Sequence, residues 1–153
     1  MKNYVRLERL IVNNVKTSAL DDIPSDSEGL RKVKALYRAL KLKDQQLIKE
    51  ILVDEPVWDV SPGFPEGAIY RGISEVFGGF YHRLLARVHS FGAFPDKFVD
   101  GGDTVVALGH YQITKSDGST QVFVRFSHVW GIDGKGRVKG VWQVADSAQF
   151  FAS

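Results

Sequence analysis

The sequence predicts an α+β domain in which three helices come first and a curved antiparallel β-sheet follows. Apolar residues recur every three or four positions through much of residues 27–88, whereas the period shortens to about two from there onward. The length of 153 residues, 44% of them apolar, suits one such domain and excludes a two-domain enzyme with a nucleotide-binding half.

Each of the three helices has its own signal. Ser25 and Glu28 have capping-box spacing and should open the first helix. Asp44 can cap a shorter second helix, which we expect Pro56 to stop. A third helix begins near Ser74 and presents an apolar and aromatic stripe: Val76, Phe77, Phe80, Tyr81, Leu84 and Val88.

The strands are expected at residues 57–60, 88–99, 104–114, 121–132 and 137–146. Short turns rich in Gly and Asp join the last four strands, so these strands run antiparallel to one another. A bent sheet of this kind has an apolar concave face that the three helices can cover. Incomplete cover would leave a conical pocket.

Composition narrows the function classes. Without cysteine there is no disulfide, thiolate metal site or cysteine nucleophile, which fits a reducing compartment. The net charge of +2 is too small to indicate a basic nucleic-acid-binding surface. No apolar run reaches the roughly 20 residues that a membrane-spanning helix needs. We expect a cytoplasmic protein without nucleic-acid or membrane partners, metal or cofactor. No HExxH, P-loop, GxGxxG or GxSxG pattern occurs.

The chain divides into an N-terminal extension, residues 1–26, and a single domain, residues 27–153. Leu7, Leu10, Ile11 and Val15 share one helical face, so the extension should be partly helical and pack on its own domain or on a partner subunit. A basic organelle-targeting peptide is the alternative interpretation.

Short segments spread over residues 28–150 share their order and spacing with a known group of proteins. They are residues 36–40, 57–60, 69–72, 102–109, 126–130 and 142–146. In these segments the chain resembles the nuclear transport factor 2-like superfamily, in the SnoaL-like branch that includes ketosteroid isomerase relatives. The resemblance implies a cone-shaped domain, commonly a homodimer formed across the convex face of the sheet. It leaves the chemistry open, because this fold hosts isomerases, cyclases, dehydratases, epoxide hydrolases and proteins without a reaction.

Comparison with ketosteroid isomerases argues against their reaction. Those enzymes need a carboxylate base and two proton-bearing groups that stabilise an enolate. The base position falls on Val60, the tyrosine position on Leu36, and the protonated-aspartate position on His128. Steroid isomerisation by that route is therefore not expected, unless the register slips by one residue at Tyr37 and at Asp59.

His128 is the leading candidate for an acid/base group. Strand alternation places it on one face with Val124, Phe126 and Trp130. Among such neighbours desolvation would keep the imidazole neutral, able to donate or accept one hydrogen bond. The alternatives are a core histidine satisfied by one hydrogen bond and, less favoured, a metal ligand.

His110 and Asp146 are the further catalytic candidates. If residues 106, 108, 110 and 112 point inward, His110 would share a substrate with His128; otherwise it is a surface histidine. The resemblance places Asp146 in a region where polyketide cyclases of this superfamily carry an acid/base aspartate. Asp146 could instead cap a short helix through Phe150.

Several aromatic and polar residues are expected to line a ligand pocket. They are Tyr37, Trp58, Val60, Tyr70, Phe77, Tyr81 and Gln143. Such a lining suits a small, hydrophobic and cyclic molecule that carries one or two oxygens. Two functions follow: a proton-transfer enzyme of isomerase, cyclase or dehydratase type that uses His128, or a binding or dimeric interaction module without catalysis. A purely structural dimerisation role would instead fill the pocket with side chains.

Overall fold

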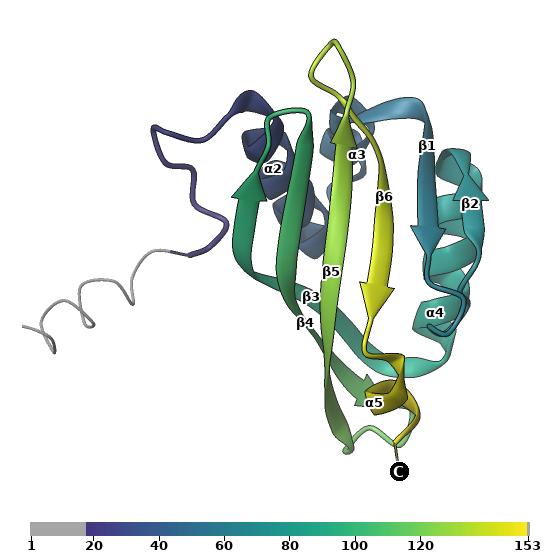
Figure 1. Ribbon diagram of the computed structural model, residues 1–153. Helices are drawn as coiled ribbons and strands as arrows, with labels where there is room; N and C mark the ends of the chain where they lie inside the picture. Colours follow the sequence, from purple (N-terminus) through teal and green to yellow (C-terminus); the bar gives the residue numbers. More distant parts are fainter. Residues whose placement is uncertain (1–17, 153) are drawn as a thin grey trace, which may run out of the picture.

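Helices cover one face of a single six-stranded sheet in the computed structural model, which describes residues 18–152 (Figure 1). The helical elements are α2 (Glu28–Leu42), α3 (Gln45–Ile51), the π-helix η1 (Ser74–Tyr81), α4 (His82–Ala86) and α5 (Ser147–Phe151). The strands are β1 (Leu52–Val60), β2 (Ile69–Arg71), β3 (Val88–Asp100), β4 (Thr104–Lys115), β5 (Gln121–Ile132) and β6 (Val138–Ala145). The predicted fold class is confirmed.

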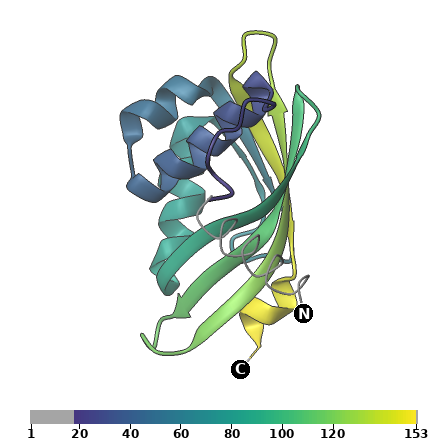
Figure 2. The same cartoon turned by 90° about the vertical axis from the view of Figure 1, so that its left-hand side faces the viewer.

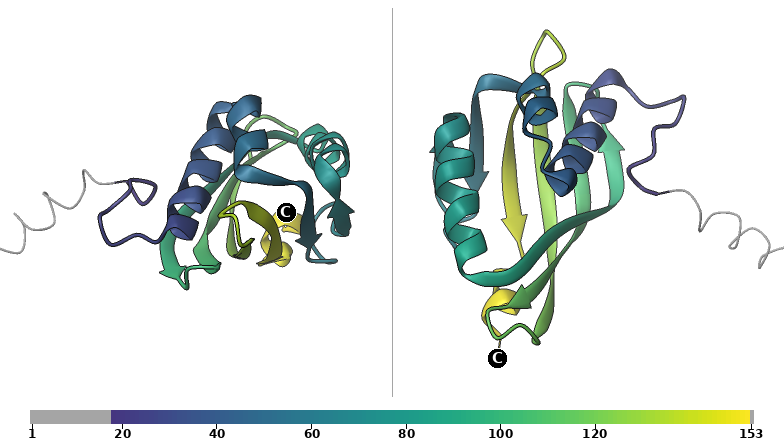
Figure 3. Two further views of the ribbon diagram at one scale, coloured as in Figure 1. Left: turned by 90° about the horizontal axis from the view of Figure 1, so that it is seen from above. Right: turned by 180° about the vertical axis from the view of Figure 1, so that it is seen from behind.

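The strands follow one another in the order β2-β1-β6-β5-β4-β3. From β3 to β6 they form the expected antiparallel meander, but β1 joins the meander by running parallel to β6. The short strand β2, which was not predicted, pairs with β1 at the opposite edge. The sheet is strongly curved, with α2, α3, η1 and α4 inside the curve (Figures 2 and 3). We call the covered side the inner face and the opposite side the outer face.

Alternation along β5 separates these two faces. Val124, Phe126, His128 and Trp130 are buried on the inner face, whereas the side chain of Phe123 on the outer face is 58% exposed. In β4 the buried residues are the odd-numbered ones, including Val105 and Tyr111. The core therefore lies between the inner face and the helices.

Two of the predicted helix boundaries are wrong. Ser27, not Ser25, caps α2 by accepting a hydrogen bond from the Leu30 amide at 3.1 Å. The carboxylate of Asp100 holds Ser27 in place through the Ser27 amide at 2.8 Å. Asp44 caps α3 as predicted, but this helix ends at Ile51 and Pro56 lies inside β1. Pro56 is tolerated there because the pairing of β1 with β6 shifts register between Leu52 and Val57.

Residues 18–27 form turns that are tied to α2. The Lys34 ammonium makes a buried ion pair with Asp26 at 2.7 Å and also donates to the Asp21 carbonyl oxygen at 2.8 Å. Burial alone would raise the pKa of Asp26, but the hydrogen bond and charge of Lys34 lower it below its usual value. The helix expected within the extension falls largely on residues 1–17, outside the described part of the chain. Within residues 18–152, no helix has the length and hydropathy needed to cross a bilayer.

Candidate functional site

His128 is the centre of a hydrogen-bonded chain on the inner face. Its ring nitrogen Nδ1 lies 2.5 Å from the Tyr37 hydroxyl, and Nε2 lies 2.6 Å from the Tyr111 hydroxyl. The imidazole stacks on the Phe126 ring, with ring centroids 3.8 Å apart and planes inclined by 7°. Helix α2, β5 and β4 thus each supply one member of a Tyr-His-Tyr chain.

Further donors fix both ends of this chain. The Trp130 indole N–H donates to the Tyr37 oxygen at 3.0 Å, and the Gln143 side-chain amide donates to the Tyr111 oxygen at 3.1 Å. The Gln143 oxygen in turn accepts from the Ser61 backbone amide at 3.1 Å. Five side chains from four elements are therefore held in one arrangement.

Burial keeps every member of the chain uncharged at neutral pH. Desolvation lowers the pKa of His128 from 6.5 to about 3, so its imidazole is neutral. Burial raises the pKa of Tyr37 and that of Tyr111 well above the ordinary value, so both phenols keep their protons. The site can donate and accept hydrogen bonds, but it carries no formal charge. Among the described residues, no group of acidic, histidine or cysteine side chains could hold a metal ion.

An aromatic wall extends this site toward β1 and η1. The ring of Trp58 lies 5.6 Å from that of Trp130 and 6.4 Å from that of Phe77. The Trp58 indole N–H donates to the Tyr81 hydroxyl at 3.3 Å, and burial raises the pKa of Tyr81 to about 12. Val60 is buried two residues beyond Trp58, on the same face of β1.

All seven predicted lining residues lie on this side of the sheet: Tyr37, Trp58, Val60, Tyr70, Phe77, Tyr81 and Gln143. Tyr70 lies opposite Trp58 in the pairing of β2 with β1, but its hydroxyl has partners of its own. Its hydroxyl donates to the Glu66 carbonyl oxygen and accepts from the Arg83 guanidinium at 3.1 Å, while its ring packs on Phe80.

His110 does not share the site with His128. It belongs to the even-numbered residues of β4, which point to the outer face, where its Nδ1 lies 3.0 Å from the Asp96 carboxylate. The amide of Gln112 lies 3.1 Å from its other ring nitrogen. The inward orientation considered for His110 is wrong, because the odd-numbered residues of β4 carry the buried side chains.

Asp146 is exposed at the end of β6, immediately before α5. Its side chain makes no capping hydrogen bond, although its backbone carbonyl accepts from the Gln149 amide at 3.1 Å. The expected side-chain cap is therefore absent at this position. The structure does not bring Asp146 to His128.

Sequence reasoning did not select Tyr111 or Trp130 as site residues. Trp130 shares the strand face of His128, so alternation alone could have placed its indole there. Tyr111 could not be placed in this way because both faces of residues 105–111 are apolar. Its ring reaches across from β4 to the imidazole on β5.

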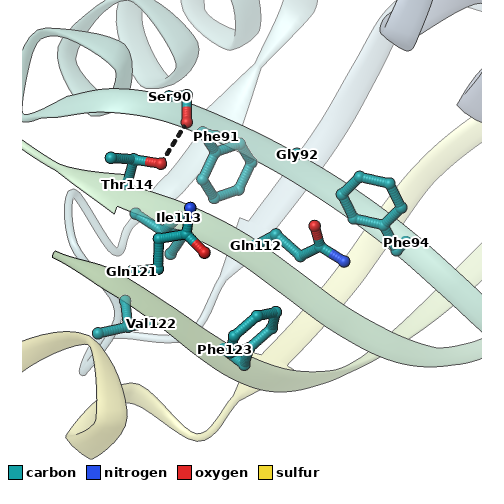
Figure 4. Close-up of a pocket in the computed structure, with 10 residues that line it drawn as sticks. All are labelled: Ser90, Phe91, Gly92, Phe94, Gln112, Ile113, Thr114, Gln121, Val122 and Phe123. Atoms are coloured by element: carbon teal, nitrogen blue, oxygen red, sulfur yellow. Dashed lines mark hydrogen bonds between the residues drawn. The ribbon is translucent and has the colours of Figure 1, made fainter. Parts of the chain in front are cut away.

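Two hollows among the described residues lie away from His128. One of about 350 Å³ is on the outer face of β3, β4 and β5, where Phe94, Gln112 and Phe123 line it (Figure 4). Another of about 390 Å³ lies between the start of β5 and α5. Within residues 18–152, every buried polar side-chain atom has a hydrogen-bonding partner. The buried polar groups of the inner site thus bind one another in this conformation.

Comparisons with known proteins identify the fold. No protein-family model matches the sequence, and no curated protein matches it. A solved nuclear transport factor 2-like protein of unknown function from Burkholderia pseudomallei is 24% identical, with a TM-score of 0.72 over 81% of this chain and 95% of that one. The chain therefore has a nuclear transport factor 2-like fold.

Two further solved structures carry functional names. A protein from Shewanella denitrificans described as a SnoaL-like polyketide cyclase is 15% identical, with a TM-score of 0.65 over 80% of this chain and 93% of that one. An LEH-like epoxide hydrolase from Mycobacterium tuberculosis is 21% identical, with a TM-score of 0.63 over 84% of this chain and 90% of that one. At these identities the likeness concerns the fold alone.

Proposed function

We propose that this protein binds a small, mainly apolar molecule against the inner face of the sheet and promotes proton transfer on it. The reaction would be of isomerase, cyclase or dehydratase type. The observation that carries this proposal is the buried His128, held between the Tyr37 and Tyr111 hydroxyls and surrounded by aromatic rings. The likeness in fold to a polyketide cyclase and an epoxide hydrolase supports it.

In this proposal His128 acts through the tyrosines. Both of its ring nitrogens already face hydroxyl groups, and its pKa of about 3 leaves it neutral. A direct proton exchange with a ligand would require one of these hydrogen bonds to break. The tyrosine hydroxyls would contact the ligand oxygen, while Trp58 and Phe77 would contact its apolar body.

In this proposal a ligand reaches the inner site when an element that covers it moves. We assign that movement to η1, which carries Phe77 and Tyr81 over Trp58. Its π-helical backbone includes Gly78 and Gly79, and both Phe77 and Tyr81 are only half-buried. π-Helical turns are frequent at functional sites, and adjacent glycines lower the cost of a backbone rearrangement.

Ligand screening on matched variants tests the proposal. Small aromatic ketones and phenols should raise the melting temperature of the wild-type protein, and mass spectrometry should detect a converted product. Tyr111→Phe should abolish conversion, whereas His110→Gln on the outer face should leave it unchanged. Stabilisation without any product would favour the non-catalytic binding alternative. Stabilisation that Tyr111→Phe and Trp58→Ala both leave intact would place the ligand elsewhere and refute the proposal.

The outer face supports a second proposal, contact with another copy of the chain. It exposes large apolar side chains on four strands: Val99 is 51% exposed, Leu108 39%, Phe123 58% and Trp142 53%. Apolar patches of this kind commonly mark protein interfaces. Sedimentation should show a dimer that Trp142→Ser dissociates and that Phe151→Ser, on α5, does not. A monomeric wild type at all concentrations would refute this proposal.

A further inference from the structure

We infer that the Tyr37-His128-Tyr111 chain contains one hydrogen-bond donor more than it can use internally. That spare donor, together with the Tyr81 hydroxyl, selects ligands with an electron-rich oxygen: a carbonyl, an enolate or a phenolate. This inference rests on the proposed function, whose ligand it specifies.

The direction of the outer hydrogen bonds is fixed by chemistry. An indole nitrogen is only a donor, so the Tyr37 oxygen must accept from Trp130. The Ser61 backbone amide is also only a donor, so the oxygen of Gln143 must face it. The NH₂ group of Gln143 therefore faces the Tyr111 oxygen and donates to it. Each tyrosine oxygen thus already accepts one hydrogen bond from a residue that is not part of the Tyr37-His128-Tyr111 chain, namely Trp130 or Gln143.

The spare donor follows from counting protons. Two tyrosine hydroxyls and one neutral imidazole carry three hydrogens, but only two gaps join an oxygen to a ring nitrogen. Each gap holds one hydrogen. Because Trp130 and Gln143 bring donors of their own, they cannot take up the third hydrogen. One tyrosine O–H is therefore left without an acceptor inside the chain.

The tautomer of His128 determines which hydroxyl is free. If Nδ1 carries the hydrogen and donates to Tyr37, then Tyr111 donates to Nε2 and the O–H of Tyr37 is free. If Nε2 carries the hydrogen, the O–H of Tyr111 is free instead. An acceptor bound at one end would therefore select one tautomer. His128 is a positioning residue that presents the donor while its own ring stays neutral.

Tyr81 adds another donor on the same side of the sheet. Its oxygen accepts from Trp58 at 3.3 Å, and within residues 18–152 no acceptor is found for its own hydrogen. Ring contacts connect it to the site, because Trp58 packs against Trp130 and Trp130 packs against Tyr37. Around Tyr111 the packed neighbours are apolar rings, namely those of Phe64, Phe91 and Phe126. A bound oxygen anion would meet hydrogen-bond donors among these rings.

A pair of nearly isosteric probes, 4-nitrophenolate and 4-nitrotoluene, tests the inference. Both can occupy an apolar site, but only the phenolate offers a charged acceptor oxygen. Wild-type protein should bind the phenolate at least about tenfold more tightly, the effect of one hydrogen bond to a charged group. Tyr81→Phe should remove about tenfold of that preference while leaving 4-nitrotoluene binding within about twofold. Tyr70→Phe is the control, because its hydroxyl already has both a donor and an acceptor.

The outcomes separate this inference from the proposed function. Equal binding of the two probes would overturn the inference and leave an apolar ligand site. If neither probe binds, the proposed site fails, and the donor count is decided by nitrogen NMR of labelled His128 without any probe. We expect one protonated and one unprotonated ring nitrogen at pH 7, each hydrogen-bonded to a tyrosine hydroxyl. Two protonated nitrogens, or a nitrogen without a hydroxyl partner, would overturn the inference.

Discussion

The inner and outer faces of the sheet each hold a histidine, His128 and His110, on the neighbouring strands β5 and β4. On the inner face two tyrosine hydroxyls bind the imidazole, and desolvation lowers the pKa of His128 to about 3. On the outer face the partners are the exposed carboxylate of Asp96 and the amide of Gln112. The comparison teaches that the same residue type acquires different hydrogen-bonding partners, and so different possible chemistry, on the two sides of the sheet.

The largest expected difference between the faces is in stability. Replacing His128 with Ala removes the partner of two buried hydroxyls and leaves a cavity, so the free energy of unfolding should fall by about 3 kcal/mol or more. Replacing His110 with Ala should cost less than about 1 kcal/mol, since its contact with Asp96 is partly exposed. Urea unfolding of both variants measures the difference. Comparable losses would contradict the distinction between the faces.

The pH dependence of stability sharpens the same comparison. Between pH 6.5 and about 3 the unfolded chain binds a proton at His128 that the folded protein does not. The contribution of this residue is therefore complete above pH 6.5 and is lost as the pH falls, by about 2 kcal/mol between pH 7 and pH 5.

The variant His128→Gln cannot titrate and should lack this part of the pH dependence. Urea titrations of wild type and variant at both pH values isolate it from the carboxylates, which titrate in both proteins. Parallel curves for the two proteins would show that the imidazole is charged, or solvated, in the folded state.

The smallest expected effect on stability concerns η1, one of the helices that cover the inner face. Gly78 in η1 has open space where a Cβ would lie, so Gly78→Ala should stabilise the protein by about 0.5–1 kcal/mol. By stiffening η1 it should also slow the association of 4-nitrotoluene, measured by stopped-flow fluorescence. Gly109→Ala is the opposite case, because its Cβ would collide with the backbone of β3 at Phe94, and it should destabilise. Faster association in Gly78→Ala would exclude η1 as the moving element.

Much of the fold could be predicted because its signals are local. The period-two strands from β3 to β6 and the Asp44 cap lie almost as expected. The strand β2 is only three residues long and carries no periodicity of its own. The shift of the first cap from Ser25 to Ser27 depends on Asp100, a residue distant in sequence. Local patterns contain no information about such contacts.

The candidate site was only partly predictable, for the same reason. In β5, polar and apolar residues alternate enough to place His128 inside. In β4, apolar residues occur on both faces, so the sequence does not show which side chains point inward. His110 and Tyr111 therefore could not be assigned to the inner or the outer face. The hydrogen bond that Gln143 donates to Tyr111 depends on pairing between three strands, β4, β5 and β6.

The parallel pairing of β1 with β6 has a consequence for folding of the nascent chain. A ribosome must deliver nearly all of residues 52–145 before these two strands can meet, whereas the hairpins from β3 to β5 can close earlier. Until β6 arrives, β1 and β5 both present unpaired backbone edges to the surroundings. The sheet therefore becomes continuous only when β6 pairs with both of them.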